Sequence, residues 1–171
     1  SAFALIAAQE REAVLVLVGG GPEERSLRSS AANLGIEGKV VFTGKLPPET
    51  VAGAYRSADL FVFPSVTETQ GIVLVEAMAA GLPVVAKAAY GSLAMVDDGV
   101  TGYLCRGEEH EFAEKTLSIL HDPQLKRRMS ASALRQAEAL AADKMALRLE
   151  KAYTALLAGD QEMLRQMGEK D

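Results

Sequence analysis

Short apolar runs alternate with amphipathic segments over the first two thirds of the chain. Five runs have the length and the β-branched or aromatic content of strands: residues 13–18, 39–43, 60–63, 84–86 and 102–105. The segments between them space apolar residues as helices do, and they begin or end at prolines and glycines. This alternation predicts the α/β class, with a Rossmann-like, doubly wound parallel sheet.

The first of these runs, residues 13–18, is apolar at every position, which predicts a strand buried on both faces. Residues 2–8 before it are expected to form the end of a helix. Helical spacing marks three further helices around residues 112–120, 125–137 and 145–156, and their methionines Met129 and Met145 are expected in the core.

Residues 1–158 are therefore expected to form one domain. The polar residues 159–171 are expected to form a C-terminal tail. Residues 90–92 follow the fourth strand and are expected to form a loop at the same edge of the sheet.

Composition narrows the class of protein. Hydrophobic residues make up 49% of the 171 positions and charged residues 24%, so the chain can bury a core, and disorder, collagen and coiled coil are excluded. There are 18 Lys and Arg against 23 Asp and Glu, a net charge of −5 with no basic block. This balance argues against nucleic acid as a partner.

The single cysteine, Cys105, cannot form an internal disulfide, which favours a reducing, cytoplasmic compartment. It is expected to be a small buried residue. No apolar run approaches the roughly 20 residues of a membrane span. His110 and His121 are expected at helix ends, and no cluster of Cys and His predicts a metal site.

The richest candidate for chemistry is the loop that joins the third strand to the following helix. Ligands of open α/β sheets bind at the carboxyl ends of the strands, and a helix N-terminus suits a phosphate. Gly71 would allow close approach. Glu76, about one turn into the helix, could accept hydrogen bonds from a sugar diol, and Glu68 would lie nearer the cleft. A glutamate at a helix start is also commonly a dipole partner or a cap, and spacing alone does not decide between these interpretations.

The same segment also resembles a known family. Residues 64–86 read Pro-Ser-Val-Thr-Glu-Thr-Gln-Gly-Ile-Val-Leu-Val-Glu-Ala-Met-Ala-Ala-Gly-Leu-Pro-Val-Val-Ala. This resembles the donor-site segment of retaining, GT4-type (group 1) glycosyltransferases of the GT-B fold, in which two glutamates flank seven residues ahead of an Ala-Met-Ala-x-Gly-x-Pro-Val-Val stretch. Residues 15–22, 41–44, 58–63 and 98–104 also resemble the family, so the likeness covers roughly residues 1–157 in order.

The resemblance implies a role for each matching residue. Glu76 would hold the ribose hydroxyls of a nucleotide sugar, and Glu68, as the catalytic candidate, would hydrogen-bond the transferred hexose. The remaining implied contacts are backbone N–H groups of Gln70, Gly71 and Ile72 to diphosphate and hexose oxygens, Lys45 and Leu46 to the base, and Gly20 and Gly21 near the nucleotide. The family needs no metal, so no cofactor is expected, and helix dipoles and cations would stabilise the departing diphosphate.

The chain also departs from the family pattern. The family's C-terminal domain opens with an earlier strand and a loop that supply an Arg and a Lys, and an N-terminal domain holds the acceptor. We therefore expect most of a donor-binding domain that is inactive by itself. In a sheet of order 3-2-1-4-5-6, the absent strand would lie between residues 13–18 and 60–63. The chain could begin earlier, another copy could fill the gap, or the two strands could pair directly.

The implied reaction is hexosyl transfer with retention, by front-face attack within an ion pair. The sequence Thr-Glu-Thr-Gln-Gly resembles that of some bacterial lipid glycosyltransferases. This resemblance favours a uridine nucleotide (a UDP sugar) and an acceptor at a membrane surface, with peripheral membrane contact of the full enzyme. Two alternatives stay open. One is a sugar-nucleotide 2-epimerase of the same fold, and the other is a noncatalytic nucleotide-binding subunit of a split glycosyltransferase.

Overall fold

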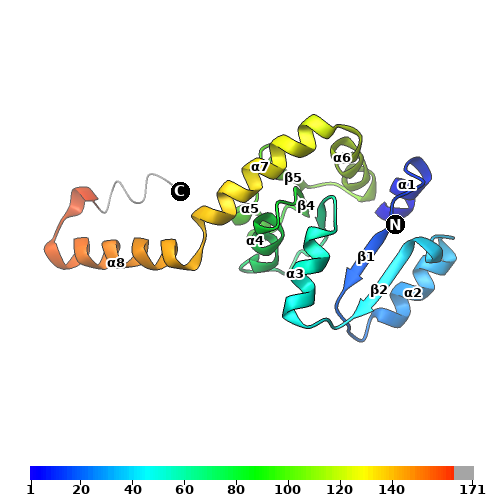
Figure 1. Cartoon of the computed structure of the whole chain (residues 1–171), viewed down its shortest axis with the longest axis horizontal. Coiled ribbons are helices and arrows are strands. Elements are labelled where there is room, and N and C mark those ends of the chain that lie inside the picture. The colour runs from blue at the N-terminus through cyan, green and yellow to red at the C-terminus, as the bar shows by residue number, and fades with distance from the viewer. Residues whose placement is uncertain (164–171) are drawn as a thin grey trace.

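The computed structural model describes residues 1–163, so part of the expected C-terminal tail, residues 164–171, lies outside the described residues. Five parallel strands alternate with helices (Figure 1). The strands are β1 (Leu15–Val18), β2 (Val40–Gly44), β3 (Phe61–Phe63), β4 (Val84–Lys87) and β5 (Gly102–Cys105). The helices are α1 (Ala2–Gln9), α2 (Glu24–Asn33), the short 3-10 helix Glu37–Lys39, α3 (Pro48–Arg56), α4 (Ile72–Ala79), α5 (Tyr90–Met95), α6 (Glu109–His121), α7 (Pro123–Ala139) and α8 (Ala142–Ala158).

The predicted α/β class with parallel strands is confirmed, but the strands form two sheets instead of a single continuous one. β1 pairs with β2 in one sheet, and β3, β4 and β5 form the other in that order. β1 does not pair with β3, and no strand from the first 12 residues lies between them, because those residues form α1 and a turn. This is the arrangement left when the central strand of a 3-2-1-4-5-6 sheet is removed.

The prediction that the first strand is buried on both faces is wrong. Val14, Val16 and Val18 are 58%, 49% and 44% exposed. Side chains alternate between the two faces of a strand. One face of the two-stranded sheet is covered by α2: the guanidinium of Arg28 on α2 lies 4.2 Å from the centre of the ring of Phe42 on β2. The other face has no such cover, so the valines remain in contact with solvent.

The core lies around the second sheet, where β4 is central and its residues Val84 and Val85 are fully buried. One face packs against α4 and α7, and the other against α6 and α7. α1 packs on α6 through Ile6 and Leu117. Gly102 allows β5 to lie beside β4, because a Cβ there would be 1.8 Å from the carbonyl oxygen of Val84. Nearly all burial in the described chain therefore belongs to this half of the molecule.

Residues 90–92 were expected to be a loop, and this prediction is wrong, since Tyr90 begins α5. The side chain of Ser92 fixes the start of the helix. Its Oγ accepts the N–H of Ala89 at 2.9 Å and donates to the carbonyl oxygens of Ala89 and Lys87. A helix of six residues is too short to give a clear apolar period, which explains why the pattern did not reveal it.

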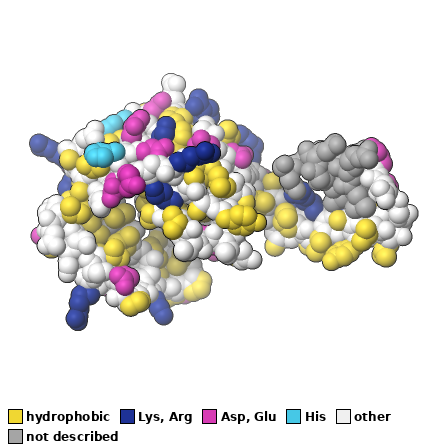
Figure 2. All heavy atoms as spheres, turned by 180° about the vertical axis from the view of Figure 1, so that it is seen from behind, with side chains coloured by type: hydrophobic (Ala, Val, Ile, Leu, Met, Phe, Trp, Pro, Cys, Tyr) yellow, Lys and Arg dark blue, Asp and Glu magenta, His cyan; other side chains and the backbone are white. Residues whose placement is uncertain are grey.

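The three C-terminal helices were predicted, and Met129 on α7 is fully buried as expected. The expectation for Met145 is wrong, because its side chain is 40% exposed on α8. α8 projects away from the sheets (Figure 1), and hydrophobic side chains lie on its surface (Figure 2). Its apolar stripe therefore faces solvent. Within residues 1–163, no helix is both long enough and apolar enough to cross a bilayer.

Candidate functional site

The loop before α4 closes around its own carboxylate. Oε1 of Glu68 accepts the backbone N–H groups of Thr69, Gln70 and Gly71 at 3.0, 2.9 and 3.0 Å. These bonds, with Gly71 and Gln70 as the largest causes, lower the pKa of Glu68. Three N–H groups that converge on one oxygen form a site built for an anion. In this structure the occupant is the side chain that precedes them.

Gly71 makes this geometry possible. It is the residue before α4 and has a left-handed φ of +68°, which suits glycine. The next N–H, that of Ile72, has no acceptor among the described residues. Of the three N–H groups expected to bind the donor, those of Gln70 and Gly71 are therefore held by Glu68, and that of Ile72 is free.

α5 holds the same loop from the other side. The N–H of Gly91 donates to the carbonyl oxygen of Glu68 at 3.1 Å. A Cβ on Gly91 would come 2.7 Å from that oxygen, so only glycine fits without a shift. Its neighbour Tyr90 is 81% exposed. Gly91 therefore contacts the loop through its backbone and helps to hold it in place. The sequence did not reveal this role.

Glu76 lies about one turn inside α4, where the sequence placed it, and is exposed. Its Oε2 accepts a hydrogen bond from the phenol of Tyr55 on α3 at 3.2 Å. Burial, and then the charge and the hydrogen bond of Glu76, raise the pKa of Tyr55 to about 12. The two residues are 21 positions apart, and no contiguous motif joins them, so the sequence pattern does not reveal this bond.

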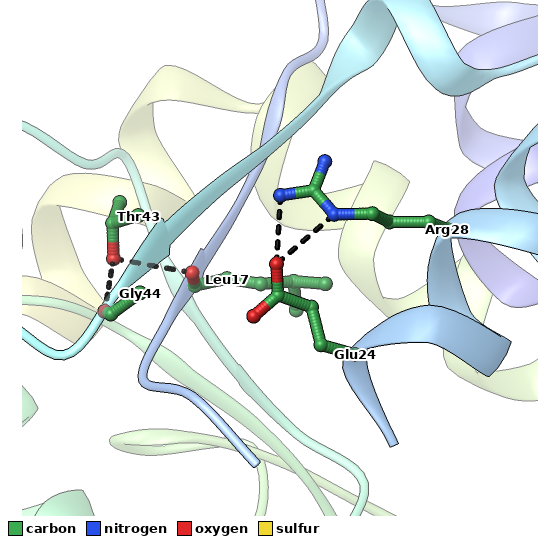
Figure 3. Close-up of polar contacts among 5 residues, drawn as sticks. All are labelled: Leu17, Glu24, Arg28, Thr43 and Gly44. Carbon is green, nitrogen blue, oxygen red and sulfur yellow. Dashed lines mark hydrogen bonds and ion pairs between the residues drawn. The ribbon is translucent and has the colours of Figure 1, made fainter. Parts of the chain in front are cut away.

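A second group of predicted residues follows β1 and β2. The N–H of Gly19 donates to the carbonyl oxygen of Gly44 at 2.9 Å, so the two loops run side by side. A Cβ on Gly20 would lie 3.7 Å from Cγ of Lys45, which Leu46 follows along the chain. Thr43 joins the strand ends, because its Oγ1 donates to the carbonyl oxygens of Leu17 and Gly44 at 3.3 and 2.8 Å (Figure 3).

A hollow of about 360 Å³ opens beside Gly21 at the start of α2. Arg25 and Arg28 line it, together with Pro22 and Glu24. Arg28 is already held by Glu24, to which its Nε and one terminal nitrogen donate at 3.0 and 2.8 Å (Figure 3). Arg25 is a cation near the expected nucleotide position that the sequence motifs did not single out.

The structure thus gathers the predicted residues into two groups. Glu68, Gln70, Gly71, Ile72 and Glu76 surround the N-terminal half of α4, whereas Gly20, Gly21, Lys45 and Leu46 lie in the two loops after β1 and β2. Among residues 1–163, no hydrogen bond or ion pair joins the two groups directly. α3 connects them, because it follows the second loop and carries Tyr55.

The other chemical candidates have structural roles. The ammonium of Lys87 donates to the carbonyl oxygen of Gly107 and ties β4 to the segment after β5. His110 and His121 lie at the two ends of α6, as expected. Cys105 is fully buried, and burial raises its pKa to about 11. In the described part of the chain, no group of three His, Cys, Asp or Glu side chains could hold a metal ion.

Comparison with known proteins decides the family. A family model described as "Glycosyl transferases group 1" matches residues 1–136. The chain belongs to the group 1 glycosyltransferases. The D-inositol 3-phosphate glycosyltransferase of Streptomyces griseus subsp. griseus is 37% identical over 155 residues. That match covers 86% of this chain and 33% of the Streptomyces protein, so this group 1 glycosyltransferase chain spans about a third of the length of such relatives.

Solved structures show the same fold. The pneumococcal O-GlcNAc transferase GtfA, in complex with UDP and GlcNAc, matches with a TM-score of 0.79 at 22% identity. This match covers 91% of this chain and 32% of the GtfA chain. The Anabaena protein HepE, solved in complex with UDP, matches with a TM-score of 0.76 at 28% identity, over 90% of this chain and 43% of its own. These neighbours have the GT-B fold, and the group 1 glycosyltransferase chain has the fold of about half of it.

Proposed function

We propose that this chain is the donor-binding domain of a retaining, metal-independent glycosyltransferase that transfers a hexose from a UDP sugar. The observation that carries the proposal is the set of N–H groups at the start of α4. They converge on one anionic oxygen at 2.9 to 3.0 Å, one turn ahead of Glu76. Membership of the group 1 glycosyltransferases and the UDP complex of HepE support a uridine nucleotide as the ligand.

In this proposal Glu68 exchanges partners when the donor binds. Oxygens of the diphosphate and the hexose take the N–H groups of Gln70 and Gly71 and the free N–H of Ile72. The carboxylate of Glu68, released from these groups, accepts a hydrogen bond from a hexose hydroxyl. A phosphate oxygen can replace the carboxylate oxygen there, because the positive end of the α4 dipole stabilises either anion.

Glu76 takes the ribose end of the same ligand. Its carboxylate is exposed and one turn behind the anion site, so the two ribose hydroxyls can donate to it. Gly20, Gly21, Lys45 and Leu46 then lie along the base and the nucleotide, beside the hollow that Arg25 lines at the start of α2. In this proposal, one UDP sugar contacts both groups of site residues.

Calorimetric titration tests the proposal. We expect binding of UDP and UDP sugars in preference to GDP and ADP sugars. Replacing Glu76 by Ala removes two charge-assisted hydrogen bonds and should lower the affinity for UDP about tenfold or more. Glu68→Ala should leave the affinity for UDP within about twofold of the parent, because Glu68 contacts the hexose and not UDP, and its removal also frees the N–H groups that it occupies. The same variant should bind the UDP sugar more weakly than the parent does.

Glu114→Ala is the matched control, because Glu114 is exposed on α6 and makes no described contact with the loop. It should bind both ligands as the parent does. The site assignment is wrong if Glu68→Ala and Glu76→Ala also bind UDP and its sugars like the parent.

A further inference from the structure

Tyr55 and Glu76 meet across two helices that are far apart in sequence. The phenol of Tyr55 on α3 donates to Oε2 of Glu76 on α4 at 3.2 Å. The two residues are 21 positions apart, so the contact exists only when α3 and α4 have both packed beside β3. It links the helix that follows the loop at Lys45 to the helix that carries the predicted ribose ligand.

The ring of Tyr55 is held in place by aromatic packing. It meets Phe61 of β3 edge to face, with centroids 5.6 Å apart and planes at 70°. Phe61 in turn stacks on Phe63, with centroids 6.0 Å apart and planes at 23°. Such pairs favour particular geometries, so this packing directs the phenol oxygen toward α4.

In this pair Tyr55 is the hydrogen-bond donor and Glu76 is the acceptor. The pKa of about 12 keeps the phenol protonated at neutral pH, so Tyr55 can donate its proton to the carboxylate of Glu76. Glu76 is exposed on a helix surface, where an unanchored glutamate samples several rotamers. One hydrogen bond to Oε2 selects among those rotamers and leaves Oε1, and the second lone pair of Oε2, open to another donor.

We propose that Tyr55 is a positioning residue that fixes the carboxylate of Glu76 in the orientation needed to accept both ribose hydroxyls of the nucleotide. This rests on the proposed function, in which Glu76 is the ribose ligand. Tyr55 acts through Glu76 and does not contact the nucleotide. It orders a flexible side chain before the ligand arrives, which lowers the entropy cost of binding, so its contribution appears only with ligands that carry the ribose diol.

The test compares UDP with 2′,3′-dideoxyuridine 5′-diphosphate, which lacks both hydroxyls. Tyr55→Phe keeps the aromatic packing and removes only the phenol oxygen. We expect it to weaken UDP about five- to tenfold and to leave the dideoxy analogue unchanged. Tyr153→Phe, on the surface of α8 where Tyr153 is 60% exposed, is the matched control and should bind both ligands as the parent does.

A double-mutant cycle completes the test. In a Glu76→Ala background, Tyr55→Phe should cause no further loss of UDP affinity, because the group that it positions is gone. Equal weakening of UDP and the dideoxy analogue by Tyr55→Phe would indicate a purely structural role and overturn the proposal, as would no weakening of either. If Glu76→Ala does not itself distinguish the two ligands, the proposed ribose role fails and the positioning role with it.

Discussion

Gly71 lies so close to the backbone of Gly91, and Gly91 so close to the backbone of Glu68, that neither glycine has room for a side chain. A Cβ on Gly71 would come 2.9 Å from the carbonyl oxygen of Gly91, and a Cβ on Gly91 would come 2.7 Å from the carbonyl oxygen of Glu68. Both neighbours are backbone atoms, which cannot turn aside. The start of α4 and the start of α5 are therefore locked together through two glycines, and the loop that holds the N–H groups lies between them.

Gly91→Ala should destabilise the protein by about 1–3 kcal/mol, the usual cost of overpacking a tight contact. The matched control is Gly53→Ala. Gly53 also lies in a helix, but a Cβ there meets nothing within 4 Å, so alanine should stabilise by about 0.5–1 kcal/mol through helix propensity. Urea denaturation gives both values. Equal effects of the two substitutions would contradict the lock.

The carboxylate of Glu68 should make the free energy of unfolding depend on pH in the acidic range. Its folded pKa lies below the ordinary value of 4.5 because backbone N–H groups stabilise the charged form. The unfolded chain thus binds the proton more readily, so the stabilisation is present above the unfolded pKa and is lost as pH falls through the folded pKa. Glu68→Gln should flatten this part of the curve of unfolding free energy between about pH 7 and about pH 3.

Glu114→Gln provides the control for this pH series, because it removes one negative charge from an exposed site on α6. A parent curve that is no steeper than that of Glu68→Gln at acidic pH would show that the three N–H bonds do not favour the charged carboxylate.

Cys105 should be inert in the folded protein. The thiol is fully buried, and burial, followed by the negative charge of Glu111, raises its pKa to about 11. Only the thiolate reacts with iodoacetamide, so we expect no alkylation at about pH 8 and rapid alkylation in denaturant. Because this is the single cysteine of the chain, intact mass reports the reaction directly. Alkylation of the folded protein at the denatured rate would contradict the burial.

The open edges of β1 and β3 should be visible in amide hydrogen exchange. Alternate N–H groups of a strand point to opposite edges. Those of Leu17 and Phe61 point toward β2 and β4, whereas those of Val16, Val18 and Val62 point toward the edge that lacks a partner. We expect the first two to exchange at least about tenfold more slowly than the other three. Equal protection would mean that a strand pairs with these edges in solution.

Much of the fold was predictable from local pattern. β5 begins and ends where the sequence placed it, and the other strands differ from prediction by two residues or fewer at each end. Apolar runs bounded by glycine and proline determine such ends by local chemistry. Burial was less predictable, because the exposure of Val16 depends on which neighbours cover the strand, and no residue near it in sequence carries that information.

The residues of the candidate site also fall into those that local sequence predicts and those that it does not. Gly71 and Glu76 could be found because their spacing belongs to a motif that is contiguous in sequence. The bond between Tyr55 and Glu76, and the contact of Gly91 with the loop, could not be found, because each joins segments that meet only after folding. The capture of three N–H groups by Glu68 follows from the left-handed conformation of Gly71, which a sequence permits but does not impose.

We expect the division of the sheet to separate the chain into two cooperative units of unequal stability. Within residues 14–46, which contain β1, α2 and β2, Ala31 is the one buried side chain, and all three hydrophobic clusters lie elsewhere. This unit should open at a lower free energy than the rest. In the proposed complex, a UDP sugar would touch Lys45 in the weak unit and Glu76 in the strong one. Ligand binding would then do what the strand ladder does not: it would couple the melting of the two units into one transition.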